Sequence, residues 1–402
     1  MHPPRPTKSD SVTSEPGRFQ AGRVATVSVA HGVHDTYSAF LPSLLPVFIG
    51  AFALSNTEAG LLTVFLQAPS LLQPFIGNLA DRVSLRYLVI LAPGVTAMMM
   101  SLLGIAPSYG VLALLLSVAG ISSAGIHSVG PVMAGRLSGP RLGRGMGIWM
   151  VGGELGRTLG PILIVSTLQI LTLRGTPWLM VAGLCMSLLL FILLRDVAGR
   201  PSNMGMALPW REALHRMGPL LAPLSGIIIL RLFATAALTT YLPTFLSEEG
   251  ASLLLAGASL SILEAAGVVG ALLGGSLSDG LGRRAVLFAS MLVTPLLMFA
   301  FLATDGWPHI PLLLLLGLSA LSITPVNMAL VQESLPENPA LANGVYMALS
   351  FVLRAGVVVV IGVIGDLLNL RTAFAVSAAA PLLGLPLVLL LPIEASHRRE
   401  AS

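Results

Sequence analysis

Residues Gly77–Arg86 read GNLADRVSLR, and residues Gly275–Arg284 read GSLSDGLGRR. The first glycine, the leucine two positions later, the aspartate and the final arginine recur at an offset of 198 residues, close to half of the 402-residue chain. Each copy lies between two long apolar runs. A repeat at this spacing predicts a tandem duplication, and parallel repeats of about six membrane spans are a transporter architecture with the substrate site between the halves.

Composition supports a membrane-embedded chain. Hydrophobic residues make up 55% of the sequence and charged residues only 10%, whereas a soluble domain carries roughly 25% charged residues. A single cysteine, Cys185, excludes a disulfide framework and a cysteine zinc cluster. Residues 1–23 are polar and rich in proline and serine, without the apolar core of a signal peptide, so we expect a disordered tail.

The apolar runs predict an all-α membrane protein with twelve transmembrane helices, because a bilayer core needs about 20 apolar residues per helix. Residues 24–194 would form the first six-helix half, 195–218 a polar linker, 219–392 the second half and 393–402 a short tail. The predicted spans are 24–50, 57–79, 87–106, 109–135, 145–172, 177–194, 219–246, 252–277, 285–304, 308–332, 340–365 and 371–392.

The distribution of basic residues predicts the orientation. Seventeen of the 22 lysines and arginines fall in the two tails, the linker and the short loops that an even number of spans places on one side. Only Arg174 and Arg371 fall in loops on the other side. The positive-inside rule then places both termini in the cytoplasm, in a multi-pass protein of the plasma membrane, the inner membrane in a bacterium. The net charge of +4 follows from this topology and gives no support to nucleic-acid binding.

The repeated loop resembles the signature loop of the major facilitator superfamily, and the resemblance covers the whole chain. Residues 152–161 (GGELGRTLGP) resemble the Gly-Pro motif of that superfamily's antiporters. Within the superfamily, the sequence is most similar to the fosmidomycin-resistance type of efflux protein. That second resemblance is carried by His31 with Asp35, by residues 71–77 (LLQPFIG), by residues 120–127 (GISSAGIH) and by the Gly-Pro motif. It implies the major facilitator fold and drug efflux.

The two signature loops are candidate gates. A carboxylate at a helix end can accept hydrogen bonds from helix N-terminal amides and from arginine, and such a latch could hold one access state. The alternative is that these residues only turn and orient the chain. The candidate gating residues are Gly77, Asp81, Arg82 and Arg86 in the first loop, and Gly275, Asp279, Arg283 and Arg284 in the second.

Ionisable residues inside predicted spans are expensive and point to function. His31 and Asp35 are four residues apart on one face of the first span, about 12–18 Å into it. An imidazole beside a carboxylate can exchange a proton near neutral pH, so the candidate proton-coupling residues are Asp35, His31, Glu264 and His127. The alternative for Asp35 is that it accepts hydrogen bonds from a neighbouring helix and never titrates.

Arginines in spans are candidates for binding an anionic substrate, because the guanidinium fork matches planar or phosphonate-like oxyanions. The repeat offset brings Arg231 close to the counterpart of Asp35. The superfamily resemblance implies that spans 1 and 7 face each other across a central cavity, so these two could pair there. Glu154 and Arg157 are spaced to pair on one helix. The resemblance implies that spans 5, 8, 2 and 11 line the seam between the halves, which makes Glu264 the expected partner of Arg354. The alternative is a structural ion-pair network. The candidate substrate-binding residues are Arg231, Arg354, Arg157, Glu154, His34, Gln67 and Tyr241.

A stripe of small residues marks the predicted fifth span. Gly152, Gly156 and Gly160 recur every four residues and would let another helix approach closely, and Pro161 would bend the helix. A tight seam between the halves would result.

The sequence therefore predicts a secondary active transporter that works by alternating access. Proton-coupled efflux of a small, anionic organic compound or drug is the leading interpretation, and uptake or facilitated transport of an organic anion is the alternative. No P-loop or zinc-protease motif occurs, so we expect no cofactor and no metal. An intramembrane enzyme or a sensor is disfavoured because the chain shows no catalytic motif and no attached soluble domain. The expected partners are a small-molecule substrate, protons and the lipid bilayer, and the expected state is a monomer.

Overall fold

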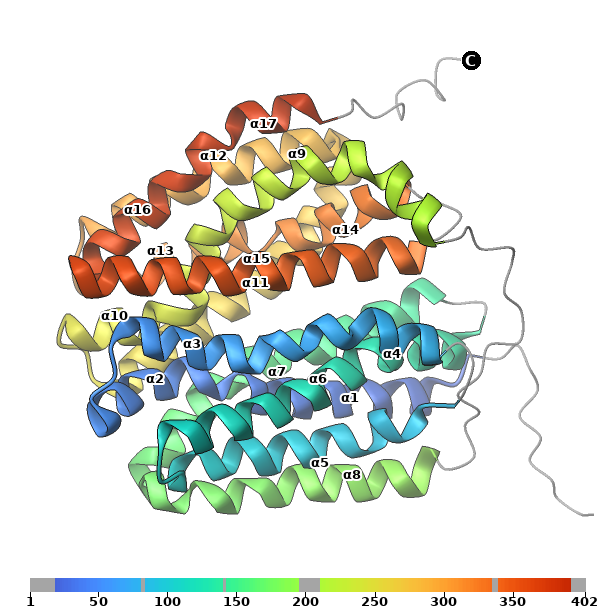
Figure 1. The fold of residues 1–402 in the computed structure, drawn as a ribbon, viewed down its shortest axis with the longest axis horizontal. Helices are drawn as coiled ribbons and strands as arrows, with labels where there is room; N and C mark the ends of the chain where they lie inside the picture. The colour runs from blue at the N-terminus through green and yellow to red at the C-terminus, as the bar shows by residue number, and fades with distance from the viewer. Residues whose placement is uncertain (1–18, 81–83, 140–141, 195–209, 335–338, 392–402) are drawn as a thin grey trace, which may run out of the picture.

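The computed structural model describes residues 19–80, 84–139, 142–194, 210–334 and 339–391, and the described secondary structure is helical. Long helices run side by side along the long axis of the molecule (Figure 1). Among the described residues, ten helices are long and apolar enough to cross a membrane.

The first half of the chain forms the lower layer in Figure 1. Its elements are α1 (Ala21–Ser38), α2 (Phe40–Phe52), α3 (Asn56–Gln67), η1 (Ala68–Leu72), α4 (Gln73–Ala80), α5 (Arg86–Leu102), η2 (Leu103–Ile105), α6 (Tyr109–Ser138), α7 (Leu142–Leu171), η3 (Leu173–Leu179) and α8 (Met180–Leu194).

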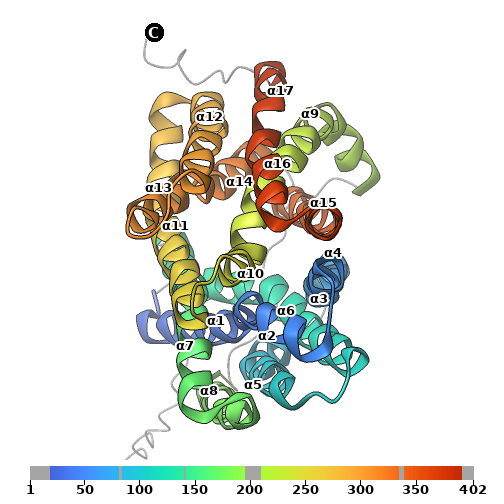
Figure 2. The same cartoon turned by 90° about the vertical axis from the view of Figure 1, so that its left-hand side faces the viewer.

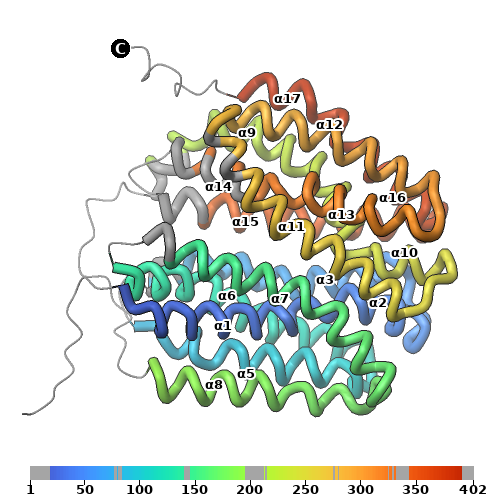
Figure 3. Tube along the Cα trace, turned by 180° about the vertical axis from the view of Figure 1, so that it is seen from behind, coloured from blue at the N-terminus to red at the C-terminus, as the bar shows by residue number. Residues whose placement is uncertain are grey.

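The second half forms the upper layer, and the view from behind in Figure 3 shows the same division. Its elements are α9 (Trp210–Ala236), the π-helical turn η4 (Ala237–Tyr241), α10 (Leu242–Glu248), α11 (Leu253–Leu281), α12 (Arg283–Leu302), α13 (His309–Ala320), α14 (Ile323–Ser334), α15 (Pro339–Leu367), α16 (Leu370–Leu383) and α17 (Leu385–Leu390).

Two of the twelve predicted crossings are not among these ten long helices, and each of the two is built from a pair of shorter helices. α1 and α2 follow one another across the bundle with a break at Ala39, and α13 and α14 are separated by Leu321 and Ser322. Proline explains both breaks, because it has no N–H for the carbonyl four residues earlier. Pro42 lies in the first turn of α2, and Pro325 lies in the first turn of α14. With these two crossings, the ten long helices make up the twelve spans.

Side-chain caps begin several spans at the end of the bundle opposite the start of α1. Ser55 and Glu58 form a reciprocal capping box at the start of α3. Ser108 caps α6, Ser252 caps α11 and Asn369 caps α16, in each case by accepting a hydrogen bond from a first-turn amide. These caps satisfy amides that have no partner within the helix.

Each layer has its own buried apolar clusters, and several helix pairs join the layers. The second half holds one large cluster and the first half holds two. Across the interface, α7 packs on α11, α3 packs on α15 and α2 packs on α10. The end-on view in Figure 2 shows these contacts between the layers. The intramembrane charges of the two halves meet where α7 lies against α11.

Candidate functional site

Close packing of α1 on α7 sets the position of Asp35. A Cβ added to Gly156 would lie 3.0 Å from the Asp35 Cβ, 2.9 Å from the Thr36 nitrogen and closer still to the Gly32 oxygen. The glycine stripe of α7 therefore faces α1 in the same half, and the prediction that it packs between the halves is wrong. Pro161 does face the other half, since its carbonyl lies beside Gly257 of α11. The stripe brings the Asp35 backbone within reach of the charged groups on α7.

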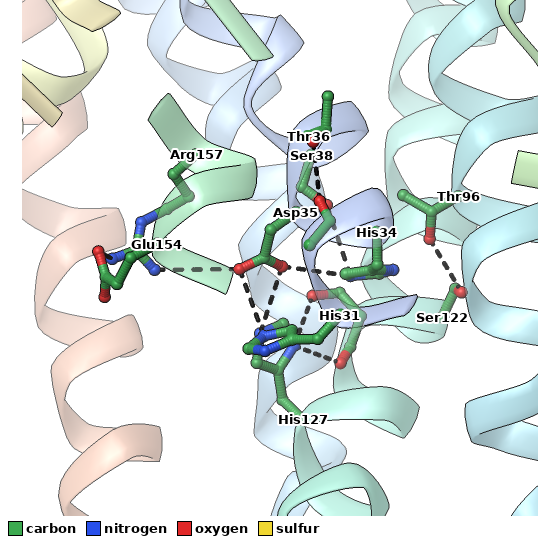
Figure 4. Close-up of polar contacts among 12 residues, drawn as sticks. His31, His34, Asp35, Thr36, Ser38, Thr96, Ser122, His127, Glu154 and Arg157 are labelled. Carbon is green, nitrogen blue, oxygen red and sulfur yellow. Dashed lines mark hydrogen bonds and ion pairs between the residues drawn. The ribbon is translucent and has the colours of Figure 1, made fainter. Parts of the chain in front are cut away.

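Asp35 lies in a cluster with three imidazoles, which we call the His–Asp cluster: His31, His34, Asp35 and His127 (Figure 4). The first three are buried, and the His127 side chain is partly exposed. The Asp35 Oδ2 atom is 3.4 Å from Nε2 of His31, and its Oδ1 atom is 3.5 Å from Nε2 of His127 and 3.9 Å from Nε2 of His34. His127 comes from α6, 96 residues from His31, so only the tertiary structure brings it to the carboxylate.

Backbone carbonyls fix the tautomers of two of these imidazoles. A carbonyl only accepts, so His31 donates from Nδ1 to the oxygen of Trp149 (3.0 Å), and His127 donates from Nδ1 to the oxygen of Ser123 (2.9 Å). Both Nε2 atoms therefore face inward, 3.3 Å apart and against the Asp35 carboxylate. The arrangement can take up a proton between them.

These three side chains also have the spacing of metal ligands. One ligand atom from each of His31, Asp35 and His127 lies within 4.8 Å of the others. The expectation of no metal site rested on local motifs, which cannot find ligands that come from two helices.

Arg157 links the cluster to the other half of the chain. Its Nη1 atom lies 4.0 Å from Oδ2 of Asp35, its Nη2 atom pairs with Glu154, and its Nε atom lies 3.7 Å from Oε2 of Glu264 on α11. The predicted Glu154–Arg157 pair is confirmed. Glu264 pairs with Arg157, whereas Arg354 was its predicted partner. The Arg157 side chain remains 44% exposed, so a ligand can reach it.

Arg354 is held by the unusual turn in span seven. Its Nη2 atom donates to the hydroxyls of Thr239 (2.7 Å) and Thr240 (3.0 Å) in η4. Single π-helical turns are frequent at functional sites. Arg354 and Glu264 also interact electrostatically. Asp35, Arg157, Glu264 and Arg354 thus alternate in charge across the two halves.

Arg231 is not part of this series of alternating charges. Its Nη2 atom donates to the carbonyl of Ala320 (2.9 Å), the last residue of α13. Among the described residues, the buried Nε atom of Arg231 has no hydrogen-bond partner and the side chain has no carboxylate within ion-pair distance. The predicted Asp35–Arg231 pair is therefore not formed in this state. Arg231 stabilises the C-terminal end of α13, at the break in that span, instead.

The remaining binding candidates lie farther from the cluster. Tyr241 donates from its hydroxyl towards the carbonyls of Val358 (2.9 Å) and Asn56 (3.1 Å), which joins η4 to α15 and to the start of α3 in the other half. Gln67 ends α3, and its buried Oε1 atom has no partner among the described residues.

The gating candidates are only partly described. Asp81 and Arg82 lie outside the described residues, as does the side chain of Asp279. Gly77 lies in α4, Gly275 lies in α11 and Arg86 begins α5. Arg283 donates to the hydroxyl of Ser278, and Arg284 donates to the carbonyls of Val388 (3.0 Å) and Leu389.

Sequence reasoning missed two residues, one that contacts the His–Asp cluster and one that contacts the start of α3. Trp149 stacks on His31, and Asp366 at the end of α15 binds the first amides of α3. The sequence offers a weak indication for Asp366, because it is an acidic residue at the end of an apolar run. It offers none for Trp149, because an aromatic residue inside a span ordinarily faces lipid or core.

Comparison with known proteins agrees with this architecture. The family model of the Major Facilitator Superfamily matches residues 27–357 and 265–402. The chain is 25% identical over 410 residues to the fosmidomycin resistance protein of Escherichia coli (strain K12), covering 97% of each chain. It is also 25% identical over 412 residues to an MFS-type transporter of Bacillus subtilis (strain 168), covering 98% of each.

Solved structures of a bacterial homolog of the human lysosomal transporter Spinster share the fold. The inward-facing, occupied form has a TM-score of 0.77 at 16% sequence identity and covers 92% of this chain and 96% of that one. The inward-facing, unoccupied form has a TM-score of 0.70 at 16% identity and covers 94% and 95%.

Proposed function

Because the chain belongs to the Major Facilitator Superfamily, we propose that it is a proton-coupled efflux transporter for a small organic acid that also carries a hydrogen-bond donor. As a member of that family it is a multi-pass integral membrane transporter of small molecules and not an enzyme. The proton coupling, the direction and the substrate class are the proposal, and each is argued below.

The observation that carries the proposal is that Asp35 lies between two imidazoles and the guanidinium of Arg157. This buried carboxylate faces two inward-pointing Nε2 atoms on one side and the guanidinium of Arg157 on the other. A proton taken up by the cluster weakens the attraction between Asp35 and Arg157. Arg157 also contacts Glu264 in the other half, so the protonation state of Asp35 changes the electrostatic attraction between the two halves. Such a change can bias alternating access.

Linkage defines which substrate would exchange against protons. A plain anion bound to Arg157 favours a protonated Asp35, because it replaces the carboxylate as the partner of the guanidinium; the two would be carried together. A substrate that also donates a hydrogen bond to Asp35 keeps the carboxylate ionised and excludes the proton. Antiport therefore needs an acid with a nearby hydroxyl, hydroxamate or amide donor. Arg354, held by the threonines of η4, supplies a second cation for the acid group.

Uptake of an organic anion together with a proton is the second candidate. The Arg157–Asp35 contact itself favours it, since plain anions and protons would bind cooperatively at this pair. Similarity to a fosmidomycin resistance protein favours efflux. The donor group on the substrate is what separates the two functions.

The arginine-rich end of the bundle is the cytoplasmic end in this proposal. The start of α1, the end of α8, the start of α9 and the end of α17 lie together at that end (Figure 1). At the opposite end α3 contacts α15 and α2 contacts α10, and in the proposed orientation these contacts close the outer side. We further propose an inner-membrane location and a monomer, in which each six-helix half moves as one unit.

Everted membrane vesicles test the function. Respiration acidifies the lumen, and addition of an antiported compound releases lumenal protons, which a pH-sensitive dye reports. The compounds are fosmidomycin and a matched pair, hydroxypropylphosphonate and propylphosphonate. Collapse of the gradient by the donor-bearing compounds alone supports antiport. The control variants are Asp35→Asn, which should be silent, and Asp305→Asn at an exposed position, which should behave as wild type.

Collapse in Asp35→Asn vesicles would reject Asp35 as the coupling residue. Accumulation of both phosphonates with protons in right-side-out vesicles, without collapse in everted ones, would reject efflux in favour of uptake.

A further inference from the structure

We propose that His31, Asp35 and His127 form a binding site for a divalent metal ion of the Zn²⁺ type. The three side chains converge from two helices, α1 and α6 (Figure 4). This inference goes beyond the proposed function, because it concerns a ligand other than the transported compound and does not require that transport be coupled to protons.

The distances between the ligand atoms match a tetrahedral zinc site. The Nε2 atoms of His31 and His127 are 3.3 Å apart, and they lie 3.4 Å and 3.5 Å from oxygens of Asp35. Zinc binds imidazole nitrogen and carboxylate oxygen at about 2.0–2.2 Å, so two ligands at the tetrahedral angle are about 3.3–3.6 Å apart. The two Asp35 distances involve different oxygens, and a small rotation of the carboxylate brings one of them to the metal.

Two of the ligands have a spacing that is typical of zinc sites on helices. His31 and Asp35 are four residues apart on α1, which places both on one face of the helix. His127 supplies the third ligand from α6. His34 is not counted among the ligands, because its Nε2 atom lies 3.9 Å from Asp35 and also faces the hydroxyl of Ser38 at 3.5 Å. Three protein ligands leave a fourth position for water or another ligand, as in open zinc sites.

The outer contacts of the two imidazoles are those of metal ligands. A metal-binding histidine almost always donates its second ring N–H to a carboxylate, a backbone carbonyl or water. His31 donates from Nδ1 to the carbonyl of Trp149, and His127 donates from Nδ1 to the carbonyl of Ser123. The buried indole of Trp149 also stacks on His31 and fixes the plane of that ring. Both Nε2 atoms are therefore directed towards a common point before a metal binds.

A metal ion satisfies all three converging groups at once. The Nε2 atom of each neutral imidazole and the Asp35 carboxylate are electron-pair donors to a metal and acceptors of hydrogen bonds. A single proton bridges two of these three groups, whereas a divalent ion contacts each of them. The His127 side chain is 28% exposed, which gives the ion a path to the site.

The surrounding charges also favour a cation. Arg157 lies 4.0 Å from Asp35, but Glu154 and Glu264 both contact the same guanidinium. Arg354 adds a second positive charge through its interaction with Glu264. Three carboxylates thus accompany two guanidinium groups, and the excess negative charge attracts a divalent cation.

Metal binding to the purified full-length chain tests the proposal. The host protein carries a tag without histidine and replacements at the four histidines outside the His–Asp cluster: His2→Gln, His215→Gln, His309→Gln and His397→Gln. Zinc is titrated against a competing chelator dye, and elemental analysis gives the stoichiometry. We expect one Zn²⁺ per chain. Mg²⁺ should not displace it, because Mg²⁺ prefers six oxygen ligands. Displacement by equal Mg²⁺, or no zinc binding to the folded host, would overturn the proposal.

Removal of each ligand tests the assignment to these three residues. His31→Gln, Asp35→Asn and His127→Gln, each in the host protein, should weaken zinc binding at least ~10-fold, since loss of an outer-shell partner alone has an effect of that size. Asp305→Asn, at an exposed position, is the matched control for Asp35→Asn and should bind zinc as the host does. Unchanged affinity in any folded ligand variant would reject the site as described.

X-ray absorption at the zinc edge gives an answer that needs no ligand variant. In the zinc-loaded host we expect nitrogen and oxygen ligands at about 2.0–2.2 Å together with the scattering pattern of two imidazoles. A shell without imidazole would overturn the proposal even if every ligand variant failed to fold. The result is independent of the vesicle assay: loss of proton-coupled flux would defeat the proposed function, and loss of zinc binding would defeat the metal site.

Discussion

The Asp366 carboxylate accepts hydrogen bonds from the backbone amide of Asn56 at 2.6 Å, although the two residues are 310 positions apart. Its second oxygen accepts from the amide and the hydroxyl of Thr57. An acid from the end of α15 in one half thus caps the first turn of α3 in the other. Ser55 accepts from the amide of Glu58 in the same turn. A carboxylate at a helix N-terminus is favoured by both the free amides and the helix dipole.

Removal of this contact should loosen the closed end of the transporter. In Asp366→Ala, the amides of Asn56 and Thr57 lose their acceptor, at a cost of about 1 kcal/mol. We expect roughly five-fold faster hydrogen exchange in the peptide that begins α3, measured by mass spectrometry. Glu249→Gln is the matched control, because it removes an ion pair with Arg371 at the same end but within one half. Equal exchange in wild type and Asp366→Ala would show that the contact does not hold this end.

Substitution of Asp35 should separate binding from coupling. Asp35→Asn keeps the shape of the side chain and removes the titratable group beside His31. We expect loss of proton-driven flux, with substrate exchange between equal internal and external pools retained. Counterflow of labelled substrate in proteoliposomes measures the second quantity. A variant that still couples flux to a pH gradient would place the proton site elsewhere.

Arg157 and its carboxylates should behave as one unit. Arg157→Gln leaves Glu154 and Glu264 without their shared cation, so it should lower the melting temperature of the purified protein. Glu154→Gln combined with Arg157→Gln should cost less than the sum of the single changes, because one unpaired acid is removed with the base. Additive shifts in melting temperature would show that the two side chains do not interact.

The glycine stripe should tolerate no added side chain where it meets α1. In Gly156→Ala, the new methyl group would meet the backbone of Gly32 and Thr36 and push α1 away from α7. Asp35 would then move out of reach of Arg157, so we expect proton-coupled flux to fall at least ten-fold. Gly147→Ala on the same helix has open space around it and should be silent. Full activity in Gly156→Ala would show that this helix contact is adaptable.

Arg354 and Arg231, the two arginines inside spans of the second half, should give different phenotypes. Arg354→Gln should raise the KM for an anionic substrate. Arg354 lies on α15, and the threonine hydroxyls of η4 hold its guanidinium at the proposed substrate site. Arg231→Gln should mainly lower thermal stability, because its guanidinium supports the end of α13 at the break in the span. Transport assays and melting curves on both variants measure the contrast. A raised KM in Arg231→Gln without a change in stability would instead support the prediction that Arg231 binds the substrate.

The sequence by itself determined the spans, the repeat and the residues that are costly to bury. These features depend on local hydrophobicity over about 20 residues and on a fixed offset along the chain. They can therefore be recognised without knowing which helices pack together. The same reasoning identified Asp35, His31, Arg157 and Glu264, because a charge inside an apolar run is visible in the sequence alone. It also predicted the Glu154–Arg157 pair, since three residues on a helix span less than one turn.

Only the tertiary structure decided which charges meet. Repeat symmetry placed Arg231 opposite Asp35, yet its guanidinium binds the Ala320 carbonyl, and Arg157 approaches Asp35 instead. Spacing along the chain could not join His127 to His31 or Asp366 to Asn56, because each pair comes from different helices. The rotation and depth of a helix in the bundle follow from side-chain packing, such as Gly156 against Gly32. Ion pairs form only within a few ångströms, so small differences in that packing select the partner.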